Sequence, residues 1–420
     1  MTRVCLVTTG HPSTNPRLVK EADALTEAGY DVRVVAAKFV AWADAADAAF
    51  ADRPWQTEWV RFGEMAAPRN RVFRSARRRL GRMLVPRLGA RRPMLEWALH
   101  YVTPELARLA ARTPADLYIA HNLGALPAAA RAARRHGARL GFDAEDFHRG
   151  ELPDTPATAE ERQMIRLAEE RYVPGCDYVT AASDGIAEAY ASALAIPRPV
   201  TILNVFPLAD RAAAVPEAEL ADEVPAGTRS LHWFSQTIGP GRGLEDALAA
   251  LPLLPDDVVL SLRGLWAPGY EAVLRAEADR LGVGHRLRAL PPCPPDEVVR
   301  RAAAHDVGLA LEVAETLNRD LCVTNKLFTY LLAGLPFVAT DTTGQRGVCE
   351  TLPAATRLYP AGDPGAFAEA VCSLLDAPDA RDAAEEAGRE QFNWNVEAER
   401  FLEVVARVLT GRSVLQAPSR

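Results

Sequence analysis

The sequence predicts an α/β protein made of two doubly wound lobes, each a parallel sheet covered by helices, that face each other across a cleft. Three observations predict this fold. Short runs of aliphatic and β-branched residues alternate with longer segments of helical period, and this alternation starts again after residue 229. The chain has 420 residues, enough for two domains of about 200 residues that each bury a core.

The first lobe is predicted over residues 1–205 and opens with a strand, a helix and a second strand. In this helix Leu18, Ala22 and Leu25 recur at helical spacing, and Gly29 follows as a C-terminal cap. Two strands joined by such a helix pair in parallel. The predicted strands of this lobe are 4–9, 31–37, 117–121, 139–144, 177–182 and 200–204.

The second lobe is predicted over residues 230–391 and repeats this architecture. Between the lobes, residues 206–229 are rich in proline, alanine and acidic residues and poor in large apolar ones, as is typical of an interdomain linker. We therefore expect two separate Rossmann-like lobes. The predicted strands of the second lobe are 230–235, 258–264, 286–290, 306–311 and 336–340.

The composition argues against several classes of protein. A net charge of −7 gives no overall attraction to nucleic acid. The six cysteines are scattered without metal-ligand spacing, so neither disulfides nor a zinc site is expected. The first apolar run is too short for a signal peptide, and no stretch reaches the roughly 18–20 apolar residues of a membrane span. We therefore expect a cytoplasmic protein with no nucleic-acid partner.

A glycine-rich turn follows the first strand of the second lobe. In "SQTIGPGRGLEDAL", residues 235–248, three glycines surround Arg242 just before a helix. A flexible turn with a central arginine at the carboxyl end of a strand suits a diphosphate. The alternative is a tight strand-to-helix turn with a solvated arginine. The turn after the first strand, residues 9–17, lacks the G-x-G-x-x-G fingerprint, which disfavours a nicotinamide-dependent dehydrogenase.

Lys326 is one of only three lysines in a chain with 45 arginines, and it lies at the start of a predicted helix. A lysine in the first turn is unfavourable for the helix alone, because the helix dipole is positive there. It becomes favourable if an anion binds to the backbone amides near Thr324 and Asn325. The alternative is an ordinary exposed lysine.

These patterns resemble the GT-B glycosyltransferases, in particular the large retaining family 4-like group that uses nucleotide-activated sugars. The resemblance covers nearly the whole chain. Its most specific part is "TNKLFTYLLAGLPFVATD", residues 324–341, and the turn around Arg242 resembles the family's donor-diphosphate turn. "YIAHNLGALPAA" and "GFDAEDFH" resemble the strand ends that carry a sugar-facing histidine and an acidic loop. The final helix, about 392–412, resembles a segment that packs back on the first lobe.

The resemblance implies site residues in both lobes. The implied catalytic residues are His121, Arg242 and Lys326. The implied donor and nucleotide ligands are Gly239, Gly241, Arg242, Gly243, Arg263, Thr324, Asn325, Lys326 and Thr329. The implied acceptor-side residues are Gly10, His11, Asn15, Arg17, Asp143, Glu145 and Asp146.

Thr329 departs from the family pattern, which carries a ribose-binding glutamate at this position. The companion glutamate, eight positions earlier, would fall on Leu321. Glu312, Glu315 and Asp320 are the nearby carboxylates that a rearranged loop could offer instead. The identity of the ribose ligand is therefore open.

The expected reaction is transfer of a sugar from a nucleoside-diphosphate sugar to an oxygen, nitrogen or sulfur nucleophile of a small molecule or glycan. The resemblance implies retention of configuration, and no cofactor and no metal are expected. Two alternatives remain: a non-hydrolysing nucleotide-sugar 2-epimerase and an inactive sugar-nucleotide-binding accessory subunit. The oligomeric state is open, with a homodimer as one expectation.

Residues 69–93 contain ten arginines with apolar residues at near-helical spacing. This pattern allows weak peripheral contact with a membrane, or contact with a phosphorylated acceptor. The alternatives are a solvated helix whose arginine stems cover apolar surface, which we favour from the sequence, and a lid on the acceptor side.

Overall fold

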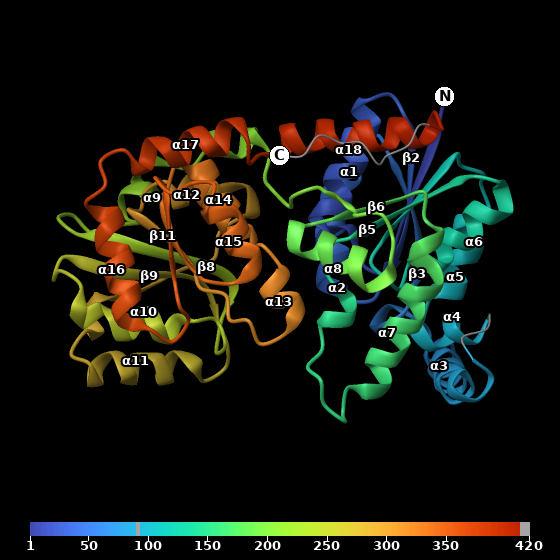
Figure 1. The fold of residues 1–420 in the computed structure, drawn as a ribbon, viewed down its shortest axis with the longest axis horizontal. Coiled ribbons are helices and arrows are strands. Elements are labelled where there is room, and N and C mark those ends of the chain that lie inside the picture. The colour runs from blue at the N-terminus through green and yellow to red at the C-terminus, as the bar shows by residue number, and fades with distance from the viewer. Residues whose placement is uncertain (90–92, 412–420) are drawn as a thin grey trace. The chain divides into compact units, whose positions relative to one another are not determined.

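The protein is described by a computed structural model over residues 1–89 and 93–411. The chain divides into two compact units, and each is described here by itself (Figure 1). The first unit is Met1–Ile202 together with the chain from Ala398 onward, and the second is Leu203–Glu397. No helix in the described residues is both long enough and apolar enough to cross a membrane.

The first unit holds, in its described residues, a seven-stranded parallel sheet in the order β3-β2-β1-β4-β5-β6-β7. The strands are β1 Arg3–Thr8, β2 Asp31–Lys38, β3 Gln56–Arg61, β4 Leu117–His121, β5 Arg139–Ala144, β6 Tyr178–Ala181 and β7 Val200–Thr201. The helices are α1 Pro16–Glu27, α2 Ala41–Asp47, α3 Pro68–Leu88, α4 Met94–Leu99, α5 Thr103–Ala110, α6 Leu126–His136, α7 Ala159–Tyr172 and α8 Asp184–Leu194.

The second unit holds a six-stranded parallel sheet in the order β10-β9-β8-β11-β12-β13. The strands are β8 Arg229–Ile238, β9 Val258–Trp266, β10 Leu287–Leu290, β11 Val307–Ala310, β12 Phe337–Thr340 and β13 Thr356–Tyr359. The helices are α9 Glu217–Ala221, α10 Leu244–Ala250, α11 Tyr270–Arg280, α12 Val298–Ala302, α13 Leu317–Leu321, α14 Asn325–Ala333, α15 Thr343–Cys349, α16 Pro364–Leu375 and α17 Ala380–Glu390. Helix α18, Trp394–Leu409, begins in this unit and continues into the first.

The two predicted doubly wound sheets are confirmed, and each of the eleven predicted strands forms. Two edge strands were missed. β3 has only one fully buried side chain, and β13 is four residues long, so neither has a strong apolar signal. β7 ends earlier than predicted because the backbone of the next two residues bonds elsewhere: the Ile202 carbonyl accepts from Arg17, and the Leu203 amide donates to Glu397.

The segment predicted as a linker, 206–229, lies within the second unit. It contains α9 and the buried side chain of Glu223, which forms ion pairs with Arg263 and Arg301. This anchoring was not visible in the composition, because a single buried carboxylate fixes a segment that is otherwise poor in apolar residues. Of the final segment predicted over 392–412, Arg412 lies outside the described residues.

In both sheets the strand order reverses at one point, between β1 and β4 in the first unit and between β8 and β11 in the second. Loops leaving the carboxyl ends of such strand pairs diverge to opposite sides, which leaves room for a ligand. The glycine-rich turn follows β8, and His121 ends β4. Both sequence motifs therefore lie at the switch points.

The tight packing around Gly308 in the core of the second unit predicts a loss of stability when this residue is replaced. A methyl group added at Gly308 in β11 would lie 2.5 Å from the ring of Tyr330, whose hydroxyl donates to the carbonyls of His232 and Leu309. We expect Gly308→Ala to lower the free energy of unfolding by about 1–3 kcal/mol in urea denaturation. Gly347→Ala, in α15 with open space around it, is the matched control and should not destabilise the protein. Equal stability of the two variants would contradict this packing.

Candidate active site

The glycine-rich turn after β8 is pressed against the end of β11. Gly241 and Gly243 have φ values of 69° and 70°, which favour glycine. A side chain at Gly243 would also place its Cβ 2.8 Å from the Cβ of Leu311. The turn therefore holds Arg242 at the carboxyl edge of the sheet. Arg242 is half-buried, and it has no hydrogen bond or ion pair to any other described residue.

Lys326 lies at the same edge, in the first turn of α14. Its buried Nζ is 2.7 Å from Oε1 of Glu312, which follows β11, and 5.4 Å from the ring centre of Trp233. Burial alone would raise the pKa of Glu312, but Lys326, Thr324 and the nearby Arg242 outweigh it and lower that pKa. Two cations thus act on one carboxylate, and a positive charge remains.

The N-terminus of α14 adds to this positive charge. Thr324 is the N-cap residue, yet its side chain accepts no hydrogen bond from the first turn. Helices α13, α15 and α16 each have a capping side chain, from Thr316, Thr342 and Asp363 respectively, whereas α12 and α17, which pack against α14, have none. The Leu327 amide donates to the Thr324 carbonyl, while the amides of Asn325 and Lys326 and the helix dipole favour an anion at this point. Gly239, Gly241, Arg242, Gly243, Thr324, Asn325 and Lys326 are therefore brought together at one edge.

Thr329 does not share this position. Its side chain is fully buried, and its hydroxyl donates to the carbonyl of Asn325, 3.2 Å away in the preceding turn. This bond within the helix satisfies the hydroxyl without a ligand. The structure thus gives Thr329 a different partner from the expected ribose.

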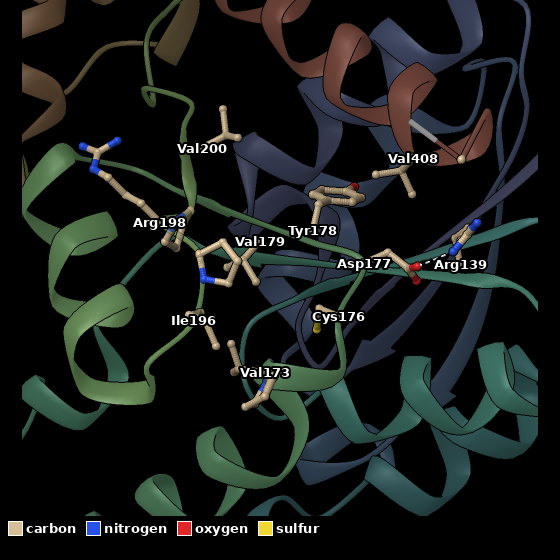
Figure 2. A pocket seen from close by; sticks show the side chains of 14 residues that line it. Arg139, Val173, Cys176, Asp177, Tyr178, Val179, Ile196, Arg198, Val200 and Val408 are labelled. Carbon is tan, nitrogen blue, oxygen red and sulfur yellow. Dashed lines mark hydrogen bonds and ion pairs between the residues drawn. The ribbon is translucent and has the colours of Figure 1, made fainter. Parts of the chain in front are cut away.

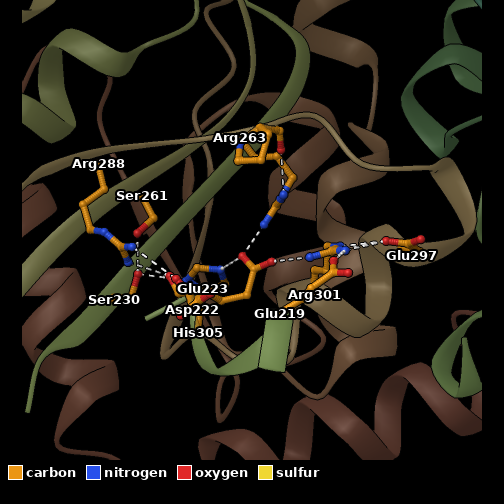
Figure 3. Close-up of polar contacts among 11 residues, drawn as sticks. Glu219, Asp222, Glu223, Ser230, Ser261, Arg263, Arg288, Glu297, Arg301 and His305 are labelled. Atoms are coloured by element: carbon orange, nitrogen blue, oxygen red, sulfur yellow. Dashed lines mark hydrogen bonds and ion pairs between the residues drawn. The ribbon is translucent and has the colours of Figure 1, made fainter. Parts of the chain in front are cut away.

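Arg263 also has a different partner from the expected donor. Its buried guanidinium bonds to Glu223 and to the Pro291 carbonyl, and Figure 3 shows it pointing to the carboxylate that Arg301 also contacts. Burial would raise the pKa of Glu223, but His305, Arg301 and Arg263 lower it to about 2. This network anchors the segment before β8 to the sheet.

In the first unit, the predicted residues Arg17, His121 and Asp143 meet beneath α1. Arg17 donates Nε and Nη2 to the two oxygens of Asp143, at 2.6 and 2.8 Å. The Asp143 carboxylate also accepts from Thr180, at 2.7 Å. Asp143 is therefore neutralised by a bidentate arginine inside the fold.

His121 lies between two carboxylates. Nε2 is 3.2 Å from Oε2 of Glu21 and Nδ1 is 3.4 Å from Oδ2 of Asp143, and the side chain is 1% exposed. Burial would lower the pKa of His121, but Glu21 and Asp143 raise it to about 9. Burial also raises the pKa of Glu21, although His121 and Arg17 oppose this effect. The carboxylates of Glu21 and Asp143 therefore favour the protonated, cationic form of His121.

Glu21, His121 and Asp143 place potential metal-ligand atoms within 4.8 Å of one another. Arg17 already contacts both oxygens of Asp143, and the protonated imidazole has no lone pair to give. This arrangement fits a charge-balanced internal cluster better than a cation site.

The remaining acceptor-side residues form contacts within the first unit. His11 Nδ1 is 2.6 Å from Asp47, while its Nε2 accepts from the Phe39 amide. Asn15 caps α1 by accepting from the Leu18 amide, and Gly10 donates to Thr8. Glu145 and Asp146 are half-buried, and burial together with Asp143 and Asp146 raises the pKa of Glu145.

A cavity of about 380 Å³ lies at the opposite edge of the first sheet (Figure 2). It is lined by the first residues of three strands, namely Arg139 of β5, Tyr178 of β6 and Val200 of β7. These are the amino ends of the strands, whereas the predicted residues cluster at the carboxyl ends. The cavity is therefore separate from the candidate site.

Comparison with known proteins identifies a family for the first part of the chain. Residues 14–204 match the family described as glycosyl transferase 4-like domain. The chain carries a glycosyl transferase 4-like domain. The predicted family resemblance and the predicted enzyme class, a glycosyltransferase, are confirmed by this match. No curated protein sequence matches the chain.

Solved structures share the fold across the whole length of this glycosyltransferase. Anabaena HepE in complex with UDP has a TM-score of 0.70 and 16% identity, covering 97% of this chain and 100% of that one. Sucrose-phosphate synthase from Thermosynechococcus elongatus has a TM-score of 0.71 and 15% identity, covering 98% and 100%. Trehalose 6-phosphate synthase from Burkholderia multivorans has a TM-score of 0.66 and 16% identity, covering 100% and 99%. These likenesses confirm the GT-B class of fold.

Sequence reasoning missed Glu21 and named Glu312 only as a substitute ribose ligand. Glu21 lies four residues after Arg17 on the apolar face of α1, where a charged pair is unusual, and this spacing was a usable signal. Glu312 gave no such signal, because it is 14 positions from Lys326 and meets it only through the sheet.

The buried pair of His121 and Glu21 predicts that the stability of the fold depends on pH. The folded pKa of His121, about 9, exceeds the ordinary value of 6.5, so the stabilisation is complete below pH 6.5 and is lost as the pH rises to about 9. We expect the free energy of opening of β4, from hydrogen exchange, to fall by on the order of 3 kcal/mol across this window. His121→Gln should lose this slope, whereas His285→Gln, at an exposed position, should keep it. A flat profile in the unaltered protein would contradict the assignment.

Proposed function

We propose that this glycosyltransferase transfers a sugar from a nucleoside-diphosphate sugar, with the donor diphosphate bound at the carboxyl edge of the second sheet. One observation carries the proposal: Arg242, Lys326 and the uncapped start of α14 converge there with a positive charge that Glu312 alone does not cancel. A diphosphate has the charge and the acceptor oxygens that such a site binds.

UDP is the first nucleotide to test. Anabaena HepE was solved in complex with UDP, and separately with UDP-glucose, and its fold matches along 97% of this chain. At 14–16% identity these structures support the choice of probe only. The acceptor is a small molecule or glycan with an oxygen, nitrogen or sulfur nucleophile.

In the proposed reaction, the bond between the anomeric carbon and the diphosphate oxygen breaks, and its electron pair stays on the phosphate. The acceptor nucleophile bonds to the anomeric carbon on the same face, which gives retention, and its proton passes to the departing phosphate. Arg242, Lys326 and the α14 amides stabilise the growing negative charge electrostatically, in the role that a divalent ion takes in other enzymes.

We assign His121 a positioning role in place of the expected catalytic one. Both of its ring nitrogens face carboxylates of the first unit, and its side chain is buried. A protonated His121 would hold Asp143 and the strand end that precedes Glu145.

The test of this function begins with a thermal-shift panel of UDP, GDP and ADP on the full chain, since a ligand of the native state raises its melting temperature. Arg242→Ala and Lys326→Ala should each weaken binding of the stabilising nucleotide roughly 10- to 100-fold, the effect of losing a charge-assisted hydrogen bond, and should lower sugar transfer at least as much. Lys326→Arg should retain part of the activity because it keeps the charge opposite Glu312.

Arg275→Ala, which removes an exposed arginine of the same unit, is the control and should behave like the unaltered protein. Unchanged affinity and turnover in both alanine variants would overturn the proposed site. Conversion of the donor to its C2 epimer without an acceptor would instead support the epimerase, and tight binding without turnover would support an accessory subunit.

A further inference from the structure

Helix α3 exposes an apolar stripe along one side. Its members are Val72, Phe73, Leu80 and Met83, which are 70%, 62%, 46% and 59% exposed, with Ala76 exposed between them. On a helix with 3.6 residues per turn, these five positions fall within an arc of about 100°. Of ten large exposed apolar side chains in the described residues, four lie on this one helix. Scattered surface apolar residues are ordinary, but such a cluster marks an interaction surface.

The helix cannot bury this stripe by rotating, because its opposite side is fixed. A side chain at Gly81 would place its Cβ 2.7 Å from the Ala98 amide of α4, which lies beside α3 (Figure 1). On the same side Arg77 bonds to Glu105 at 2.8 Å. The stripe is therefore a stable feature of the surface.

Four arginines of α3 that lie away from the stripe have carboxylate partners: Arg74 and Arg77 contact Glu105, while Arg78 and Arg82 contact Glu161. Arg71, which also lies away from the stripe, has no carboxylate partner among the described residues. The arginines on or beside the stripe, Arg69, Arg79 and Arg87, have no carboxylate partner among the described residues. The helix contains no acidic residue, so its outer side is both apolar and positive.

A groove of about 880 Å³ lies beside the stripe, and its lining includes Arg79, Met83 and Arg87 as well as the paired Arg78 and Arg82 and the carboxylate of Glu160. Over residues 75–87 of the helix it places unpaired basic side chains next to apolar ones. This combination suits a phosphate-bearing headgroup whose hydrocarbon chains lie close by.

We propose that this outer side of α3 docks on the surface of an anionic lipid bilayer. The apolar stripe enters the boundary between headgroups and acyl chains, and the unpaired arginines contact lipid phosphates. The view favoured from the sequence, a solvated helix with arginine stems covering apolar surface, holds in part, since the Arg77 guanidinium lies 5.6 Å from the ring centre of Phe73, but Phe73 remains 62% exposed. Residues 90–92 of the segment predicted for membrane contact lie outside the described residues, and the surface defined here does not include them. This inference is independent of the proposed donor site.

Co-sedimentation of the full chain with vesicles tests the surface directly. We expect binding to vesicles of equal parts phosphatidylcholine and phosphatidylglycerol, little binding to phosphatidylcholine alone, and weaker binding as salt is added. A variant with Val72, Phe73, Leu80 and Met83 changed to Ser should bind at least about tenfold less well. Arg69→Gln, Arg79→Gln and Arg87→Gln together should lose the preference for anionic vesicles.

The matched control is Leu253→Ser with Val273→Ser, which removes two exposed apolar side chains of the second unit and should leave vesicle binding unchanged. Because every altered side chain is exposed, circular dichroism should show unchanged folding in all variants. Absence of binding by the unaltered chain, or equal binding by the stripe variant, would overturn the proposal. The proposal would also be overturned if the unaltered chain formed a dimer without lipid and the stripe variant lost this dimer but still bound vesicles. Nucleotide binding, measured separately, should be the same in all of these variants.

Discussion

Charge balance at the carboxyl edges of the two sheets is the constraint on which the rest of this structure depends. A charged group that leaves water inside a fold needs a partner, or the fold loses several kcal/mol. In the first unit each buried cation faces a carboxyl group, since Arg17 and His121 lie against Asp143 and Glu21. In the second unit Glu312 meets Lys326, while Arg242 has no carboxylate of its own. At the edge of the first sheet the charged side chains pair with one another. At the edge of the second sheet Arg242 remains available to bind an anion.

The same contrast separates the roles of similar residues. Arg17, Arg242 and Arg263 were all predicted as site residues, Arg17 on the acceptor side and the other two on the donor side. Only Arg242 is held on a turn whose backbone conformation requires glycine, outside the hydrogen-bonded core. The bidentate pair of Arg17 with Asp143 ties α1 to the sheet, and the pair of Arg263 with Glu223 ties the segment before β8 to it.

Much of the fold was predictable because buried parallel strands leave a strong apolar signal and their helices a periodic one. The edge strands β3 and β13 were missed because one-sided burial weakens that signal. The anchoring of Glu223 and the partner of Lys326 were not predictable. Both depend on residues far apart in sequence that meet only when the strands are ordered. Local spacing placed the site motifs at the edge of the sheet. It did not show which of their side chains would form hydrogen bonds or ion pairs with other residues of the chain.

The scarcity of lysine gives this chain an unusual chemical property. Beside the N-terminus, the only primary amines are those of Lys20, Lys38 and Lys326, and the last is buried against Glu312. A reagent that modifies primary amines therefore has few targets on the surface of this protein. Whether Lys326 reacts would report directly on the opening of its pairing with Glu312, without any engineered label.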